Sequence, residues 1–292
     1  MVSAARTAAY LLRRRPRAVI VQAPPVPAVA LVWLWAKLAR APVVIDSHPS
    51  SFGLEGDHAR HRLMRPLLAQ LAARSDGCIV TTPRLADEVR RWKGSPLVVH
   101  EAPMEWSDRM QPRDCSAGRR VLFVNTFAPD EPWLEVLDAA RAMPEATFQV
   151  TGDLRRRLSG APPSPPNVEW VGYLKSDQYV EALAQADVVM TLTRRADSVQ
   201  RSAHEAVDAL RPLVVSDWPH MHELFPHAVF VENTAVGIRA GLEETFRRCH
   251  ELTARAPEAR AIQHRRWTKQ LGQLQSALRL VGNGGVNSFT QT

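Results

Sequence analysis

The sequence predicts an α/β protein with two domains, each built on a parallel sheet that is covered by helices on both faces. Short, continuously apolar runs such as AVIVQ at 18–22 and PVVID at 42–46 are typical of strands buried on both faces. Helical stretches separate these runs, and β–α–β alternation of this kind indicates a parallel sheet. A polar, aperiodic stretch at 101–118 divides the alternation into two series.

The first series begins with a helix over residues 1–17 that ends in a basic cluster. Strands are expected at 18–22, 42–46, 77–81 and 97–100, and helices at 28–39, 57–73 and 83–92. Pro83 opens the last of these helices, where its missing N–H does no harm. We therefore assign residues 1–104 to an N-terminal domain and residues 105–118 to a linker.

The second series is longer. Strands are expected at 120–125, 147–151, 168–172, 188–192, 213–216 and 228–231, and helices at 132–143, 176–185, 202–210, 220–225, 235–250 and 257–280. These elements form a C-terminal domain over residues 119–281. The tail at 282–292 is rich in Gly, Asn and Ser, and we expect it to be disordered.

Composition limits the classes of partner. The net charge of +7 suits phosphates, anionic lipid headgroups or nucleic acid, although Arg-rich codon usage alone explains it equally well. No RNA-binding aromatic motif or zinc-finger spacing occurs, so a nucleic-acid partner is not expected. The three cysteines, Cys78, Cys115 and Cys249, lie far apart and form no C-x-x-C, which indicates neither a zinc site nor a disulfide framework and favours a reducing compartment.

The apolar run at 26–36 is shorter than the roughly 20 residues that span a bilayer, and it lacks a signal-peptide cleavage site. The sequence therefore predicts a cytoplasmic protein. Residues 1–17 mix apolar positions with five Arg, and such a helix can lie at the inner face of the cell membrane. An ordinary surface helix is the alternative.

The stretch at 191–219, TLTRRADSVQRSAHEAVDALRPLVVSDWP, is expected to run from a strand through a polar loop and a helix to a second strand. It places Asp197 and Glu205 eight residues apart. A helix N-terminus favours a diphosphate, and a carboxylate one turn further can accept hydrogen bonds from ribose hydroxyls. Ser202-x-x-Glu205 is also the pattern of a capping box, in which Glu205 merely caps its own helix.

Together with NVEWVGY at 167–173, ADVV at 186–189 and PLVVSD at 212–217, this stretch resembles the C-terminal domain of group 1 (family 4) retaining glycosyltransferases. The likeness is good over 120–244 and looser over 18–99. It implies a GT-B fold, in which two Rossmann-like domains face a cleft. Here the N-terminal domain is expected to be incomplete, because no Gly-rich strand–turn unit precedes residue 18.

The resemblance implies transfer of a sugar from a nucleotide-diphosphate sugar to a glycan, lipid-linked or small-molecule acceptor, with retention of configuration. No cofactor and no metal are expected. Glu205 would bind the ribose, and Asp197 and His48 would be the catalytic residues beside the transferred sugar. The residues expected to bind the nucleotide sugar are Glu205, Ser202, Ala206, Arg194, Arg195, Gly152 and Arg155.

Several positions depart from the family pattern. Asp197 stands where the family usually has the longer Glu, and Arg211 replaces a Gly at a helix end that often requires a positive φ. The Arg…Lys pair that usually follows the first strand of this domain is absent from residues 125–131. Two alternatives therefore stand beside the transferase: a catalytically weakened nucleotide-sugar-binding or accessory subunit, and a nucleotide-sugar epimerase on the same fold.

Overall fold

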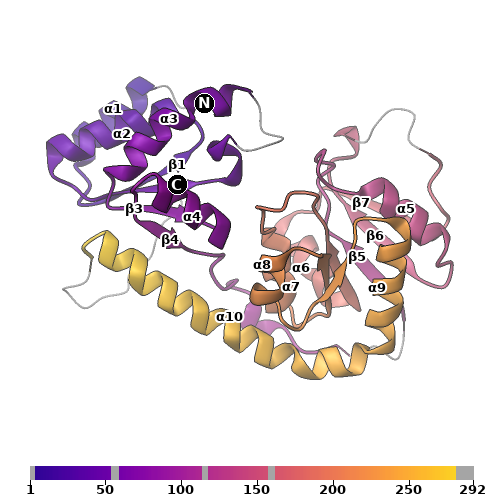
Figure 1. Cartoon of the computed structure of the whole chain (residues 1–292). Coiled ribbons are helices and arrows are strands. Elements are labelled where there is room, and N and C mark those ends of the chain that lie inside the picture. Colours follow the sequence, from indigo (N-terminus) through magenta and orange to yellow (C-terminus); the bar gives the residue numbers. More distant parts are fainter. Residues whose placement is uncertain (1–3, 54–58, 114–117, 157–161, 281–292) are drawn as a thin grey trace. The chain divides into compact units, whose positions relative to one another are not determined.

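The computed structural model describes residues 4–53, 59–113, 118–156 and 162–280. They form two compact units (Figure 1). The N-terminal unit comprises the described residues up to His100 together with those from Thr268 onward, and the C-terminal unit those from Glu101 to Trp267. The last turns of the C-terminal helix, from Thr268 onward, therefore belong to the N-terminal unit. Helical periodicity in the sequence does not predict this assignment. The tail expected to be disordered lies outside the described residues.

The N-terminal unit has one sheet of parallel strands in the order β1 (Val19–Ala23), β2 (Val43–Ser47), β3 (Gly77–Val80) and β4 (Pro96–Val98). The helices of this unit that precede β4 are α1 (Ala4–Arg14), α2 (Val26–Ala39), the 3-10 turn η1 (Pro49–Phe52), α3 (Ala59–Ala73) and α4 (Pro83–Arg91). Val43, Ile45 and Val80 are fully buried, as expected for strands with helices on both faces.

The C-terminal unit has six parallel strands: β5 (Arg120–Phe123), β6 (Thr147–Thr151), β7 (Val168–Gly172), β8 (Val188–Thr191), β9 (Leu213–Ser216) and β10 (Val229–Val231). Their order is β10-β9-β8-β5-β6-β7. Within this unit the chain forms β5 first, continues to β6 and β7 at one edge of the sheet, and then crosses to β8 on the other side of β5. The direction of winding reverses between β5 and β8, and doubly wound sheets bind ligands beyond the carboxyl ends of strands at such a switch point.

The helices of this unit are α5 (Trp133–Arg141), α6 (Ser176–Gln185), α7 (Arg201–Asp208), α8 (Pro219–Leu224), α9 (Ala235–Arg247) and the first part of α10 (Cys249–Ala277), with short 3-10 turns η2 (Ser107–Arg109) and η3 (Leu154–Arg156). Residues of α5 and α9 share one buried apolar cluster with inward residues of the sheet, and residues of α6, α7 and α8 form the cluster on the opposite face. The sheet is therefore covered on both sides.

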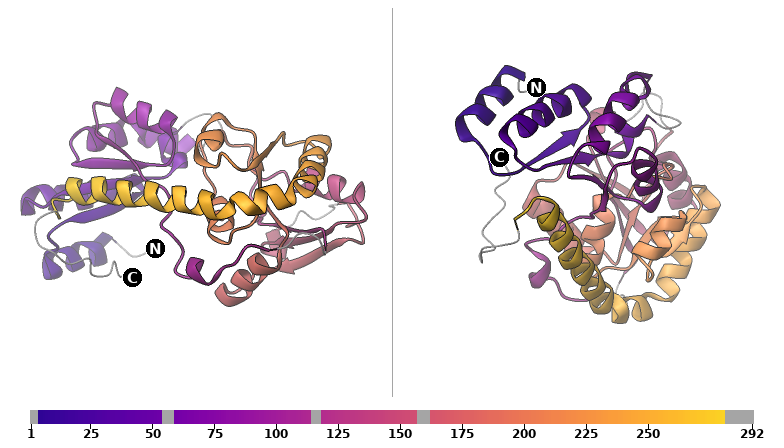
Figure 2. Two further views of the ribbon diagram at one scale, coloured as in Figure 1. Left: turned by 90° about the horizontal axis from the view of Figure 1, so that it is seen from below. Right: turned by 60° about the vertical axis from the view of Figure 1, so that its left-hand side comes forward.

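Two features differ from the sequence analysis. Helix α10 begins at Cys249 and continues through Pro257, and Figure 2 shows it as one long helix. Periodicity misplaces its start by eight residues because the proline resembles a helix boundary. Cys249 is also disulfide-bonded, whereas the fully buried Cys78 is a free thiol. The cysteine spacing indicates no disulfide framework, and it carries no signal for this bond, because no spacing motif accompanies Cys249.

Candidate functional site

A wide pocket of about 800 Å³ lies at the carboxyl edge of the C-terminal unit's sheet. Its lining residues come from the segments that follow β5, β6 and β7 and from the start of α6. They are Val124, Asn125, Thr126, Thr151, Gly152, Asp153, Arg155, Arg156, Gly172, Tyr173, Leu174, Ser176 and Tyr179. This is the edge of the sheet at which the topology favours a ligand.

Gly152 shapes the floor of this pocket. Its φ is 116°, and a Cβ at this position would lie 2.7 Å from the carbonyl oxygen of Asn125, so only glycine fits. Arg155 follows in η3 with a side chain that is 90% exposed. Its Nε and Nη2 donate to the Asp153 carboxylate at 2.9 and 2.8 Å. Both residues predicted here, Gly152 and Arg155, therefore line the pocket.

The loop after β8 is anchored by buried polar contacts. Thr193 donates from Oγ1 to the Asp130 carboxylate at 2.6 Å, and its amide donates to Ser216 Oγ at 2.9 Å. Arg194 donates to the Glu135 carboxylate at 2.7 Å, and the amide of Arg195 donates to Thr193 Oγ1 at 3.1 Å. The Arg194 guanidinium is thus paired with an acid of α5 in this structure.

Asp197 lies in the same loop, close to a histidine of α8. The ring Nε2 of the buried His220 lies 3.2 Å from the carbonyl oxygen of Ser198. Burial lowers the pKa of His220 below its ordinary value, while the Ser198 carbonyl and the negative charges of Asp197 and Glu223 act in the opposite direction. The carboxylate of Asp197 therefore has a neutral imidazole in its neighbourhood at pH 7.

Helix α7 carries the second acid of the motif. It begins at Arg201 after Gln200, which makes no side-chain cap. Ser202 is buried, and its Oγ lies 2.7 Å from Thr191 Oγ1 at the end of β8. Ala206 is fully buried against the sheet. The capping-box alternative for Glu205 is not realised, because that pattern requires Ser202 as the N-cap, whereas the N-cap is Gln200, two residues earlier.

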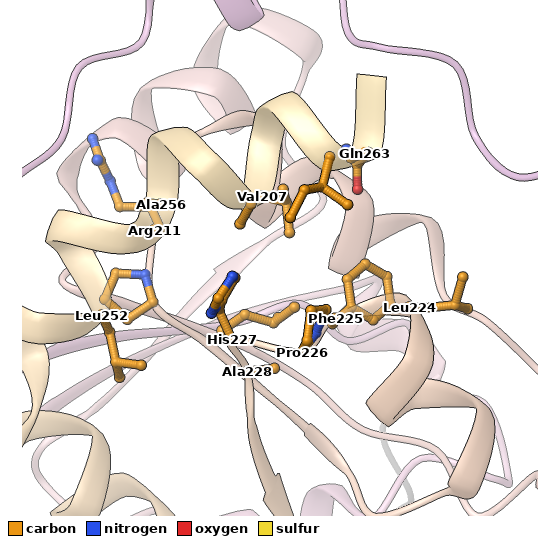
Figure 3. A pocket seen from close by; sticks show the side chains of 14 residues that line it. Val207, Arg211, Leu224, Phe225, Pro226, His227, Ala228, Leu252, Ala256 and Gln263 are labelled. Carbon is orange, nitrogen blue, oxygen red and sulfur yellow. The ribbon is translucent and has the colours of Figure 1, made fainter. Parts of the chain in front are cut away.

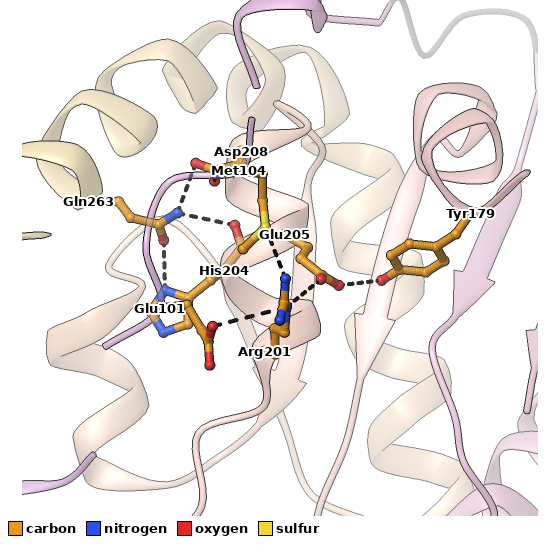
Figure 4. Close-up of polar contacts among 8 residues, drawn as sticks. All are labelled: Glu101, Met104, Tyr179, Arg201, His204, Glu205, Asp208 and Gln263. Carbon is orange, nitrogen blue, oxygen red and sulfur yellow. Dashed lines mark hydrogen bonds and ion pairs between the residues drawn. The ribbon is translucent and has the colours of Figure 1, made fainter. Parts of the chain in front are cut away.

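The Glu205 carboxylate is instead held by two side chains (Figure 4). Its Oε2 accepts a hydrogen bond from Tyr179 Oη at 2.6 Å, and its Oε1 accepts one from Arg201 Nε at 2.9 Å. The Glu205 side chain is 13% exposed. Tyr179 also lines the wide pocket, so Glu205 is hydrogen-bonded directly to a residue of the pocket's lining. Tyr179 cannot be identified from the sequence, since a tyrosine in an amphipathic helix carries no signal that distinguishes it from a core residue.

The opposite side of α7 is fixed to α10 by a buried polar network that the sequence does not reveal either. Asp208 is fully buried and accepts hydrogen bonds from the Met104 amide at 2.7 Å and from Gln263 Nε2 at 2.9 Å. His264 Nε2 lies 2.9 Å from the same carboxylate oxygen that Gln263 contacts. Gln263 Oε1 also lies 2.9 Å from His204 Nδ1 (Figure 4). The helix that presents Glu205 is therefore held in place by α10.

Arg211 does not adopt the strained conformation that its position suggested. The positive φ, 57°, falls on the preceding Leu210. Arg211 is buried, and its guanidinium donates to the carbonyl oxygens of Leu183, Ala184 and Gln111 at 2.8–3.0 Å. Burial lowers its pKa to about 10. The arginine caps the carboxyl end of α6, and the left-handed conformation at the end of α7 is adopted by Leu210 instead.

The loop after β5, where the Arg…Lys pair is absent, contains a carboxylate that accepts hydrogen bonds from the loop's own backbone. The Glu131 carboxylate accepts hydrogen bonds from the amides of Thr126 and Ala128 at 2.8 and 2.9 Å, and from Thr126 Oγ1 at 3.1 Å. Burial raises the pKa of Glu131, and these hydrogen bonds oppose that rise. The backbone donors of this loop are thus already occupied by a side chain.

The N-terminal unit places His48 directly after β2. The residue is exposed, its amide donates to the carbonyl oxygen of Ala23 at 3.0 Å, and its ring Nε2 contacts Gln22. It therefore lies at the carboxyl edge of that unit's sheet, beside the end of β1.

Among the described residues, no group of three or more His, Cys, Asp or Glu side chains could hold a metal ion. His220 and His222 face different partners, because His222 Nε2 lies 2.6 Å from Asp217 Oδ1. Within the same described ranges, no helix is both long and apolar enough to cross a membrane.

A second hollow in the C-terminal unit lies between α10 and the segment joining α8 to β10 (Figure 3). Arg211, Leu252 and Ala256 are among its lining residues. Its accessible volume of about 30 Å³ is far smaller than the 800 Å³ of the wide pocket. It also lies at the amino ends of β9 and β10, so it is not a candidate nucleotide site.

Two parallel-sheet α/β units, with an acid-bearing loop and helix at the carboxyl edge of the second, form the GT-B fold that solved structures share. A family profile described as "Glycosyl transferase-like" matches residues 131–279, just over half of the chain, and one described as "Glycosyl transferase 4-like domain" matches residues 1–103. The chain belongs to this glycosyltransferase family, and the resemblance to group 1 (family 4-like) enzymes is confirmed.

Solved structures share the fold at low sequence identity. Alr3699/HepE of Anabaena, crystallised with UDP and glucose, is 16% identical with a TM-score of 0.70, over 94% of this chain and 80% of that one. Sucrose-phosphate synthase from Thermosynechococcus elongatus is 15% identical with a TM-score of 0.72, over 96% and 78%. A trehalose-phosphate synthase from Burkholderia xenovorans, crystallised with glucose-6-phosphate, is 13% identical with a TM-score of 0.72, over 94% and 76%. No curated protein sequence matches the chain significantly.

Proposed function

We propose that this glycosyltransferase uses a nucleotide-diphosphate sugar as donor and transfers the sugar with retention of configuration, without a metal or other cofactor. The observation that carries the proposal is the Glu205 carboxylate, held beside a pocket of about 800 Å³ at the carboxyl edge of the sheet. A pocket of this size is within the range that small-molecule ligands occupy. The structures of HepE with UDP and UDP-glucose support a nucleotide sugar as the ligand class.

In this proposal the nucleobase occupies the wide pocket, and its ribose hydroxyls donate hydrogen bonds to Glu205. The N-terminal turn of α7, which contains Ser202, faces the diphosphate, whose charge is compensated by the helix dipole and nearby arginines. Ala206, one turn further, packs against the sheet and supports this turn from behind. Arg155 and Arg195 are the arginines proposed for this task, and Arg194 joins them by exchanging Glu135 for a phosphate. Positive charge there assists departure of the nucleotide diphosphate.

Asp197 is proposed to contact the transferred sugar from the loop after β8. His48 is the proposed contribution of the N-terminal unit to the same sugar. The acceptor is a glycan, a lipid-linked sugar or a small sugar. The trehalose-phosphate synthase crystallised with glucose-6-phosphate supports a sugar-type acceptor.

The test is turnover with a panel of UDP-, GDP- and ADP-linked hexoses, with release of the nucleotide diphosphate as the readout. We expect the wild-type protein to release it from at least one donor, and NMR of the product to show the donor's anomeric configuration. Glu205→Ala should reduce the rate at least tenfold at subsaturating donor, because a hydrogen bond to a charged group is lost. Release that is equally fast in Glu205→Ala would contradict the proposal.

One observation favours the alternative of a binding or accessory subunit. Glu131 fills the backbone donors of the loop after β5, and Arg155 and Arg194 are each paired with a carboxylate. A protein that binds nucleotide diphosphates but turns over no donor in the panel would fit this alternative. An epimerase would instead produce an epimerised nucleotide sugar without any acceptor.

We also propose that the N-terminal unit associates with an anionic membrane surface through α1 and α2. Leu12 and Leu38 are 65% and 78% exposed and line one shallow hollow with Arg15, Arg17 and Arg40. Exposed leucines beside clustered arginines suit the boundary between headgroups and acyl chains. We expect sedimentation with phosphatidylglycerol vesicles, less at high salt, and none with phosphatidylcholine vesicles; equal sedimentation with both would contradict this proposal.

A further inference from the structure

The two oxygens of the Glu205 carboxylate are held from two different helices. Tyr179 Oη on α6 donates to Oε2 at 2.6 Å, and Arg201 Nε on α7 donates to Oε1 at 2.9 Å. The Arg201 side chain is 62% exposed, and an exposed ion pair one turn apart on a helix orients its partner only weakly. The short bond from the half-buried Tyr179 is therefore the contact that fixes the direction of the carboxylate.

The phenol group retains a second capacity in this arrangement. Its single proton points to Glu205, so the remaining lone pairs of Oη can accept a hydrogen bond. Tyr179 also lines the wide pocket, and Glu205 is hydrogen-bonded to this lining residue. A hydroxyl group of a ligand that reaches Glu205 from this pocket therefore meets two neighbouring acceptors, the carboxylate of Glu205 and the phenol oxygen of Tyr179.

Both acceptors require a ligand that donates. A ribose hydroxyl can donate its proton to one of these oxygens, whereas a hydrogen atom at the same carbon cannot. Sites built to bind a hydroxyl group reject analogues that lack it, because the polar groups of the site are then desolvated without a partner. The geometry thus predicts discrimination between ribonucleotides and deoxyribonucleotides.

We propose that Tyr179 is a specificity-determining residue that acts with Glu205, so that the site selects nucleotides whose ribose carries the hydroxyl group that meets these two oxygens. This inference rests on the proposed nucleotide site and deepens it. Tyr179 acts partly as a positioning residue, since it sets the direction of the Glu205 carboxylate, and partly as an acceptor in its own right.

The test compares binding of UDP, GDP and ADP with their 2′-deoxy and 3′-deoxy forms by calorimetry. For the nucleotide that binds tightest, we expect the wild-type protein to favour the ribose form over at least one deoxy form by about tenfold or more. Tyr179→Phe should reduce that preference about fivefold, the effect of one hydrogen bond. Tyr10→Phe, which removes the same oxygen from an exposed tyrosine of α1, should leave the preference unchanged.

A double-mutant cycle with Glu205→Gln separates this role from general loss of structure. Because the two residues act together, Tyr179→Phe should have little further effect in the Glu205→Gln background. Thermal unfolding of each variant verifies that it is folded. Fluorine at the discriminating carbon of the nucleotide provides a second test that needs no variant. It occupies the hydroxyl's position but cannot donate, so the wild-type protein should bind the fluoro analogue as weakly as the deoxy form.

The outcomes distinguish this inference from the function on which it rests. Absence of binding by all three ribonucleotides would overturn the proposed nucleotide site and this inference with it. Binding of a ribonucleotide with an unchanged preference in a folded Tyr179→Phe variant would overturn the role of Tyr179 alone. A fluoro analogue that binds as tightly as the ribonucleotide would overturn it as well.

Discussion

At the level of single residues, the wide pocket contains two glycines whose backbone conformation residues with a side chain rarely adopt. Gly152 and Gly172 both have positive φ, 116° and 73°, and both line the wide pocket. They differ in their surroundings: a Cβ on Gly152 would lie 2.7 Å from a backbone oxygen, whereas one on Gly172 would meet no atom within 4 Å. The two glycines therefore separate the cost of backbone conformation from the cost of a steric clash.

Gly152→Ala should destabilise the protein by about 3 kcal/mol or more, because conformational strain and a clash with backbone add together. Gly172→Ala, the matched control, should cost only about 1–2 kcal/mol, the penalty of the left-handed region for a residue with a Cβ. Urea unfolding measures both. Equal losses in the two variants would contradict the close approach of Gly152 to Asn125.

His220 provides a prediction for pH. Burial lowers its pKa below the ordinary 6.5, so the unfolded chain takes up a proton on acidification before the folded protein does. The contribution of His220 to stability is therefore complete above pH 6.5 and is lost as the pH falls below it. The effect is limited to about 1.4 kcal/mol per pH unit for one proton.

Between pH 7 and pH 5.5, the unfolding free energy of the wild-type protein should fall more steeply than that of His220→Gln. Other titrating groups contribute alike to both proteins, and the difference between the two curves isolates His220. Parallel curves would show that the folded His220 accepts a proton as readily as the unfolded one.

At the scale of elements, the position of α7 is the decisive feature. Ser202 connects its first turn to β8, and Asp208 connects its last turn to α10 and to the Met104 amide. Glu205 lies between these two anchors, with its carboxylate turned to Tyr179. A short helix of eight residues gains little stability by itself, so these tertiary contacts set its orientation.

Asp208→Asn should reduce the unfolding free energy by about 3 kcal/mol, because an amide group would replace a fully buried carboxylate oxygen that accepts hydrogen bonds. Asp177→Asn makes the same chemical change at an exposed position of α6 and should stay within about 0.5 kcal/mol of wild type. Denaturant unfolding measures both changes. A small effect at Asp208 would show that α10 does not hold α7 through this carboxylate.

At the scale of the whole molecule, the alternation of apolar runs and helices was sufficient to predict both parallel sheets. Buried strands such as β3 and β9 are continuously apolar or nearly so, and their bounds agree with prediction to within a residue. Helix α10 was less predictable, because a proline within a helix and a helix boundary at a proline look alike in sequence. The assignment of its last turns to the N-terminal unit is a tertiary property.

The motif around Glu205 could be found from sequence, since acids at a fixed spacing between two apolar strands form a local pattern. The partners of its residues could not. Tyr179 lies 26 positions before Glu205, and Gln263 lies 55 positions after Asp208. Glu131 lies in the loop after β5, for which the sequence indicated only the absence of the Arg…Lys pair. Such contacts form only when the helices and loops pack around the folded sheet, and no periodicity in the sequence encodes them.

Binding of a nucleotide diphosphate by Glu205 and the adjacent pocket can be measured by titration calorimetry of the intact protein with UDP, GDP and ADP. At least one of the three should bind. Glu205→Gln should weaken this affinity about 10- to 100-fold, and Glu258→Gln, at an exposed position of α10, should leave it unchanged. Binding of none of the three, or equal affinity in Glu205→Gln, would contradict this role of Glu205 and the pocket.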